Sequence, residues 1–278
     1  MALESTRRRR RDRAVTPAIS TVIITGIMVA LVTVAFAFAS NFLLVRMAES
    51  EFNSARQTMQ TLGLQVDDVA WIVGRTETMR YSSKYGGVSF RQALNYTIYV
   101  NTTEPQSNLR FYTGLTGIAC FDMPVSQYSL ADDYFELVYP SSDDRFLFNE
   151  TSAPVTRTFV VEKLEMADGS FIRVVVAPTI RVLSLSIGDT PYVRAYLPIL
   201  SQEETPGNSQ SITLTGESTT TKTIEGVTGI KIVVNFPVSG FDNSFFNFRE
   251  TVESIQLAGE AVLEVYLGGV DVAFGAHA

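Results

Sequence analysis

The chain has 278 residues, which fits a short segment plus one domain of about 200 residues, or two β domains of about 100. A hydrophobic content of 46% with 18% charged residues excludes collagen-like and intrinsically disordered proteins. Without residues 1–14 the chain keeps 16 basic and 27 acidic residues, a net charge of −11, so the body of the protein is acidic.

A basic tip begins the chain, with six arginines between Arg7 and Arg13. A basic tip before an apolar segment is what the positive-inside rule predicts for a tip that stays in the cytoplasm. The other interpretation is a nucleic-acid-binding arm, which we disfavour because the apolar segment follows immediately. We therefore expect no nucleic-acid partner.

The segment from Ala14 to Val45 contains 32 residues without a charge. About 20 residues suffice to cross the hydrocarbon core of a membrane as a helix. A cleaved secretory signal peptide, with Ala37-Phe38-Ala39 as its cleavage site, is disfavoured because its apolar region would be too long. Two interpretations remain: a plain signal anchor, and a prepilin-type leader that is cut before the apolar stretch, so that the helix stays.

The string Arg13-Ala14-Val15-Thr16-Pro17 places a basic and a small residue directly before a proline-containing apolar start. It resembles the class III signal peptides of archaeal type IV pilin-like proteins and archaellins, over about residues 7–45. The resemblance implies that a prepilin peptidase removes a basic leader, 1–14, by cutting between Ala14 and Val15. Thr16 stands where the family more often has Ser, and Ile19 where bacterial pilins have Glu.

Beyond Val45 the sequence becomes polar, but apolar residues persist at alternating spacings of four and three. This heptad pattern predicts an amphipathic extension over residues 46–73. With no proline from Ala18 to Val73, we expect one helix from about Pro17 to about Val73, in which Gly63 is a place for a bend or break. The expected helix seam consists of Ala48, Phe52, Ala55, Met59, Leu62, Val66, Val69 and Val73.

Residues 74–278 are predicted to form an extracellular β-rich domain, with a subdivision or a long loop near 201–211. Apolar and polar residues alternate along several runs, which favours antiparallel strands packed as a sandwich. The fold class is thus α+β, with one long N-terminal helix followed by an antiparallel β-sandwich-like head. The expected strands are 94–100, 134–139, 155–164, 171–177, 192–197, 212–215, 230–236 and 261–267, and a short helix is expected at 243–257.

The sequence contains few residues that could form a catalytic or metal site. Its only histidine, His277, is next to the C-terminus, and its only cysteine, Cys120, is predicted to be a buried small apolar residue. We therefore expect no enzyme, cofactor or metal site. We interpret the acidic pairs as parts of solvated loops, and the alternative for Asp132, Asp133, Asp143 and Asp144 is calcium binding. The phenylalanines within residues 241–248 are predicted to lie in the core.

Three sequons, at Asn95, Asn101 and Asn149, are candidates for N-glycosylation on a surface protein. The leading functional hypothesis is a pilin-like structural subunit, inserted in lipid through its helix and then associating with itself or with other pilin-like subunits in a surface filament for adhesion or motility. The alternative is a single-pass anchored binding module that does not polymerise.

Overall fold

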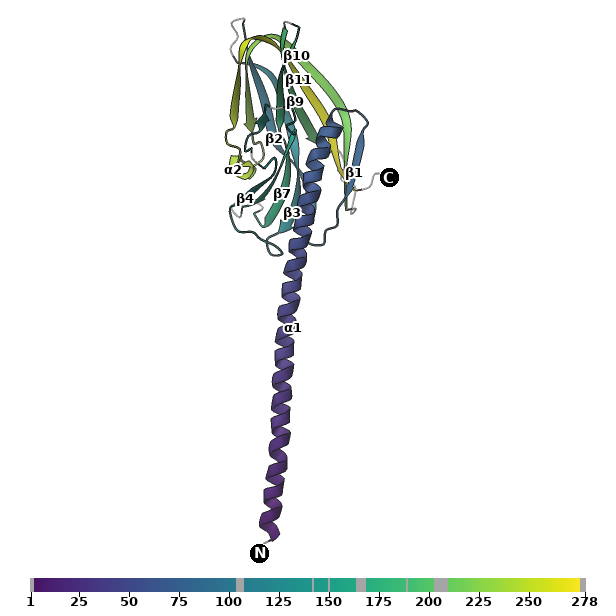
Figure 1. Cartoon of the computed structure of the whole chain (residues 1–278), viewed down its shortest axis with the longest axis vertical. Coiled ribbons are helices and arrows are strands. Elements are labelled where there is room, and N and C mark those ends of the chain that lie inside the picture. The colour runs from purple at the N-terminus through teal and green to yellow at the C-terminus, as the bar shows by residue number, and fades with distance from the viewer. Residues whose placement is uncertain are drawn as a thin grey trace. The chain divides into compact units, whose positions relative to one another are not determined.

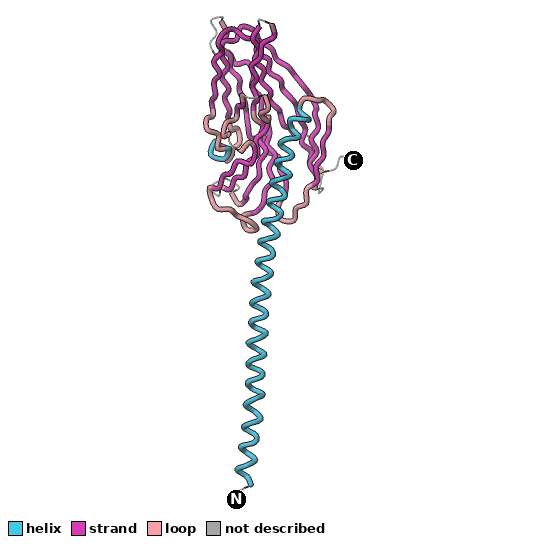
Figure 2. The backbone as a smooth tube through the Cα atoms, viewed as in Figure 1, coloured by secondary structure: helices cyan, strands magenta, loops and turns pink. Residues whose placement is uncertain are grey.

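The structure, a computed structural model, describes residues 3–275 except 104–107, 142, 150, 164–168, 189 and 203–209, and the side chains of 3–18 are not described. The chain divides into two units, Met1–Ala48 and Glu49–Ala278. The first unit is helical, and the second contains the remainder of the same helix and all the strands (Figures 1 and 2). The elements are α1 Leu3–Ala70, β1 Thr76–Arg80, β2 Gly87–Thr102, β3 Leu109–Pro124, β4 Tyr134–Tyr139, β5 Leu147–Phe148, β6 Thr156–Glu162, β7 Phe171–Pro178, β8 Ile180–Ile187, β9 Thr190–Ser201, β10 Ser211–Asn235, α2 Asn243–Phe246 and β11 Val252–Phe274.

The long helix is present, but its ends differ from the expected ones. It begins at Leu3 and not near Pro17, since arginine is a good helix former and residues 3–16 contain no glycine or proline. It ends at Ala70, where the chain turns through Gly74, a residue with φ of 83°. Val73 therefore lies beyond the helix and is 63% exposed, so its assignment to the seam is wrong.

All eleven strands of the described chain belong to one hydrogen-bonded sheet, and a sandwich of two separate sheets is not seen. The reason is the length of β10, which has 25 residues. Its first five residues pair with β1 and eight residues between Val227 and Asn235 pair with β2, while β11 accompanies it along most of its length. One strand thus joins regions that two sheets would have kept apart.

The sheet is mixed, so the expectation of purely antiparallel pairing is wrong at two places. β9 runs parallel to β11, and the two-residue β5 runs parallel to β8. The order along the sheet is β4-β6-β7-β3-β2-β10-β11-β9-β8-β5. β9 and β11 are separated in sequence by the whole of β10, a long-range pairing that alternation within each strand does not specify.

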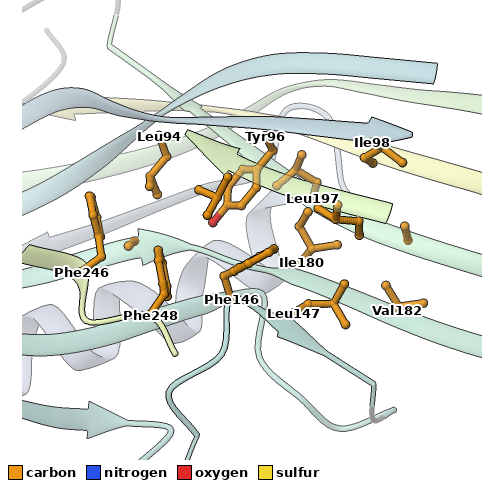
Figure 3. Packing of buried hydrophobic residues seen from close by; sticks show 14 of the residues in the cluster. Leu94, Tyr96, Ile98, Phe146, Leu147, Ile180, Val182, Leu197, Phe246 and Phe248 are labelled. Carbon is orange, nitrogen blue, oxygen red and sulfur yellow. The ribbon is translucent and has the colours of Figure 1, made fainter. Parts of the chain in front are cut away.

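The core confirms the alternation that the sequence predicts for the main strands. Leu94, Tyr96 and Ile98 of β2 are fully buried and face Leu197 of β9 and Phe146 across the interior (Figure 3). The same cluster continues through β10 and β11, so it draws on strands from both sides of residues 201–211. Of that stretch, 203–209 lie outside the described residues.

The second helix is much shorter than the expected 243–257. Asp242 caps α2 by accepting bonds from the N–H groups of Ser244 and Phe245, and Asn247 ends it in the left-handed conformation. From Val252 onward the chain is β11. The phenylalanines of this region are buried, which confirms the core interpretation, and they are Phe241, Phe245, Phe246 and Phe248.

Candidate functional site: the N-terminal helix and its docking face

The first described part of α1 exposes apolar side chains on all its faces. Every large apolar residue from Ile19 to Met47 is about half exposed or more, and Phe38 reaches 77%. By length and composition this helix can cross a membrane. An isolated apolar surface of this kind needs lipid or another apolar surface around it, so it is the first candidate for function.

The second part of α1 packs on the sheet through the predicted seam. Seven of the eight seam residues are buried, which confirms the heptad interpretation apart from Val73. Polar residues such as Asn53, Gln57 and Thr61 lie on the exposed side. This half of the helix is therefore an integral part of the second unit and not a free stalk.

Gly63 allows the helix to approach the sheet closely, and α1 shows no break there. A Cβ at this position would meet the hydroxyl oxygens of Thr156 and Thr158 of β6 at 3.0 Å. The hydroxyl of Thr156 donates a 2.8 Å hydrogen bond to the carbonyl of Gly63. Gly268 of β11 has the same role at the end of α1, where a Cβ would collide with the carbonyl of Ala70. Close packing explains this mid-helix glycine, and the expected break does not occur.

Ion pairs join the helix to strands that are distant in sequence. Asp67 accepts bonds from the two terminal nitrogens of Arg181 of β8, at 2.9 and 3.3 Å, and a third from the indole N–H of Trp71. Arg56 pairs with Glu136 of β4 at 2.6 Å. Each pair is partly shielded from solvent, so it fixes the position of the helix more strongly than a surface pair would.

Glu51 holds the loop 83–86 against the helix. Its carboxylate accepts bonds from the Ser83 hydroxyl, at 2.5 Å, and from the N–H groups of Lys84, Tyr85 and Gly86. Burial alone would raise the pKa of Glu51, but these hydrogen bonds outweigh it and the pKa is lowered. The side chain is thus held as a carboxylate in a concave set of backbone donors.

The expected processing residues Arg13, Ala14, Val15, Thr16 and Pro17 have a helical backbone within α1, but their side chains lie outside the described residues. Processing therefore stays a prediction.

The three sequons differ in accessibility. Asn149 is exposed in the loop after β5. Asn95 and Asn101 are half-buried in β2, where the side-chain oxygen of Asn95 is fully enclosed and that of Asn101 accepts a bond from the N–H of Asn108. Use of the sequons stays a prediction.

The acidic pairs do not converge. Asp143 binds Arg145, and Asp133 lies 3.5 Å from Lys163. Among the described residues no group of three metal-ligating side chains occurs. The calcium alternative gains no support from this geometry, and His277 lies outside the described residues.

The burial of Arg157 was not predicted. Arg157 of β6 is fully buried among Phe135, Phe159 and Phe248, with its guanidinium carbon 5.0–5.7 Å from the ring centres. Burial lowers its pKa to about 10, and its guanidinium donates a hydrogen bond to the carbonyl of Asp144. The alternation Arg157-Phe159-Val161 was the available signal, since it places the arginine on the apolar face of its strand.

Comparisons with protein-family models, with curated proteins and with solved structures find no significant match for this chain.

Proposed function

We propose that the chain is a pilin-like structural subunit, which is inserted in a membrane by α1 and then contributes to a cell-surface filament. In this proposal the arginine-rich tip lies in the cytoplasm and the β-rich domain on the outer side. The tip is removed by a prepilin peptidase, and the apolar half of α1 packs with the same half of other subunits. The protein has no catalytic role in this account.

The observation that carries the proposal is the extent of the exposed apolar helix. Ile19–Val45 covers 27 described residues, and the uncharged stretch covers 32, against the roughly 20 that a bilayer requires. Additional apolar turns bring no benefit to a plain anchor, because surface outside the hydrocarbon core would meet water. Packing against other helices would bury them, and small residues such as Gly26 and Ala30 would let those helices approach closely.

The position of Pro17 supports processing. In the helix Leu3–Ala70 this proline is an interior residue, where it costs about 3 kcal/mol relative to alanine. A cut between Ala14 and Val15 would make it the third residue of the mature chain. In a first helical turn the missing N–H of proline has no intrahelical partner to lose, so the cost disappears.

The test is electron microscopy of cells whose copies carry a label on the β-rich domain. The proposal expects labelled filaments from the native chain. Ala14→Asp should block the cut and leave the chain in the membrane without filaments, while Ala2→Asp, the same change away from the cut, should assemble normally. Filaments of the Ala14→Asp chain, or label spread singly over the envelope in all cells, would contradict the proposal.

The second candidate is an anchored binding module that does not polymerise. The size of the second unit favours it, since Glu49–Ala278 is larger than helix assembly requires. Label spread singly over the envelope with a fully retained helix is the result that this alternative predicts.

A further inference from the structure

A single side-chain amide interrupts the uncharged stretch of α1. Between Ala14 and Val45 the only asparagine or glutamine is Asn41, and its side chain is exposed. Phe38 and Val45, one turn before and one turn after it on the helix surface, are apolar side chains that are 77% and 47% exposed. Asn41 therefore places a hydrogen-bonding group within an apolar surface.

The amide of Asn41 differs from the hydroxyl of Thr33 in how its hydrogen bonds are satisfied. Thr33 donates a 2.8 Å hydrogen bond to the carbonyl of Val29 in its own helix. In the described part of α1 the amide of Asn41 makes no such bond. An amide offers two N–H donors and a carbonyl acceptor, and moving these groups from water into apolar surroundings without a partner costs free energy. Asn41 thus depends on a partner outside its own helix wherever α1 is packed in an apolar environment.

We propose that Asn41 hydrogen-bonds to the N-terminal helix of a second copy of this chain and so fixes the register between the two helices. The inference rests on the proposed function, in which the apolar half of α1 is surrounded by the same half of other copies. An amide both donates and accepts, so it pairs with an amide, a hydroxyl or a backbone carbonyl of an identical helix without charge repulsion. A single polar side chain in an apolar helix contact specifies register in coiled coils in the same way.

The competing partner of Asn41 is a lipid headgroup or water. A bilayer core takes about 20 helical residues, and that length counted from Ala14 ends at Thr33, eight residues before Asn41. In a lone anchor the amide would therefore be hydrated, and replacing it with an apolar side chain would remove no contact between chains. Between packed helices the same replacement removes a hydrogen bond. The effect of Asn41→Leu on the contact between copies distinguishes the two partners.

Dissociation of isolated filaments in detergent tests the partner. Asn41→Leu removes the amide with little change in side-chain size, and we expect subunits to be released about three- to tenfold faster, because one hydrogen bond between helices is lost per subunit. Asn41→Gln keeps the amide and should release subunits at a rate closer to that of the native chain. Thr33→Val is the matched control and should leave the rate unchanged, because its hydroxyl is satisfied within the helix. An Asn41→Leu filament that dissociates at the native rate or more slowly overturns the inference.

The outcomes for this contact and for the proposed filament are separable. Native filaments whose stability does not depend on residue 41 overturn this inference alone. An Asn41→Leu chain that forms no filaments, while the Thr33→Val chain does, supports it. If the native chain forms no filaments, which contradicts the proposed function, energy transfer between dye-labelled full-length chains in phosphatidylcholine vesicles makes the same comparison. Weaker transfer for Asn41→Leu than for the native chain then supports the contact, and equal transfer overturns it.

Discussion

The hydroxyl of Thr156 donates a 2.8 Å hydrogen bond to the backbone carbonyl of Gly63, 93 residues away in sequence. Both residues are buried, and the bond joins the middle of the amphipathic half-helix to β6. This contact fixes the amphipathic part of α1 within the second unit, Glu49–Ala278.

Adding a side chain at residue 63 should push α1 and β6 apart at this contact. Gly63→Val places methyl groups against the hydroxyls of Thr156 and Thr158, where a Cβ alone already lies at 3.0 Å. We expect the free energy of unfolding to fall by roughly 2–3 kcal/mol, although valine has the better helix propensity. Urea unfolding of the full-length chain in detergent, followed by the fluorescence of its only tryptophan, Trp71, measures this. Leu64→Val, on the exposed side of the helix, is the control and should change stability by less than about 0.5 kcal/mol.

Two neighbouring aspartates should respond differently to the same substitution. Asp67→Asn leaves Arg181, whose side chain is 14% exposed, without its counter-charge, and we expect a loss of about 1–3 kcal/mol. Asp68→Asn breaks only the exposed pair with Arg75 at 3.6 Å and should cost under about 1 kcal/mol. Circular dichroism during urea unfolding compares them, and equal losses would contradict a structural role for the Asp67 pair.

Glu253 should make stability depend on pH in mildly acidic solution. Burial raises its pKa from 4.5 to about 6, so the unfolded chain ionises first as the pH rises. The native state therefore loses stability between about pH 4.5 and 6, and the loss persists above pH 6, by at most about 2 kcal/mol. Glu253→Gln should remove this part of the pH dependence and stabilise the protein at pH 7. An unchanged slope across that range would show that Glu253 is not responsible.

Glycosylation should distinguish the sequons by accessibility. We expect a glycan on Asn149, which is exposed, and none on Asn95, whose side-chain oxygen is enclosed within β2. Intact-mass measurement of the native protein, of Asn149→Gln and of Asn95→Gln tests this. Only the substitution at Asn149 should remove sugar mass, and a native chain without added mass would end the hypothesis.

The elements with a strong local period were predictable. The heptad seam identified the buried side of α1, and alternation identified the core faces of β2, β10 and β11. The exact end of the helix was not predictable, because Val73 continues the heptad spacing while the turn at Gly74 depends on where β1 must begin.

The pairing of strands that are distant in sequence could not be predicted. The parallel contact of β9 with β11, and the sharing of β10 between β1 and β2, depend on strand order, which single-strand periodicity does not contain. The polar contacts between α1 and the strands also join residues that are distant in sequence. Asp67 and Arg181 are 114 residues apart, and nothing in their local sequences indicates that they meet.

The N-terminal residue of the mature protein tests the central claim most directly. Edman degradation or terminal mass spectrometry of the chain isolated from membranes or filaments should find a sequence that begins at Val15, with the apolar part of α1 retained. A chain that still carries Arg7–Arg13 would contradict the processing, and a chain that begins near Ser40 and dissolves without detergent would contradict both the filament subunit and the anchored module.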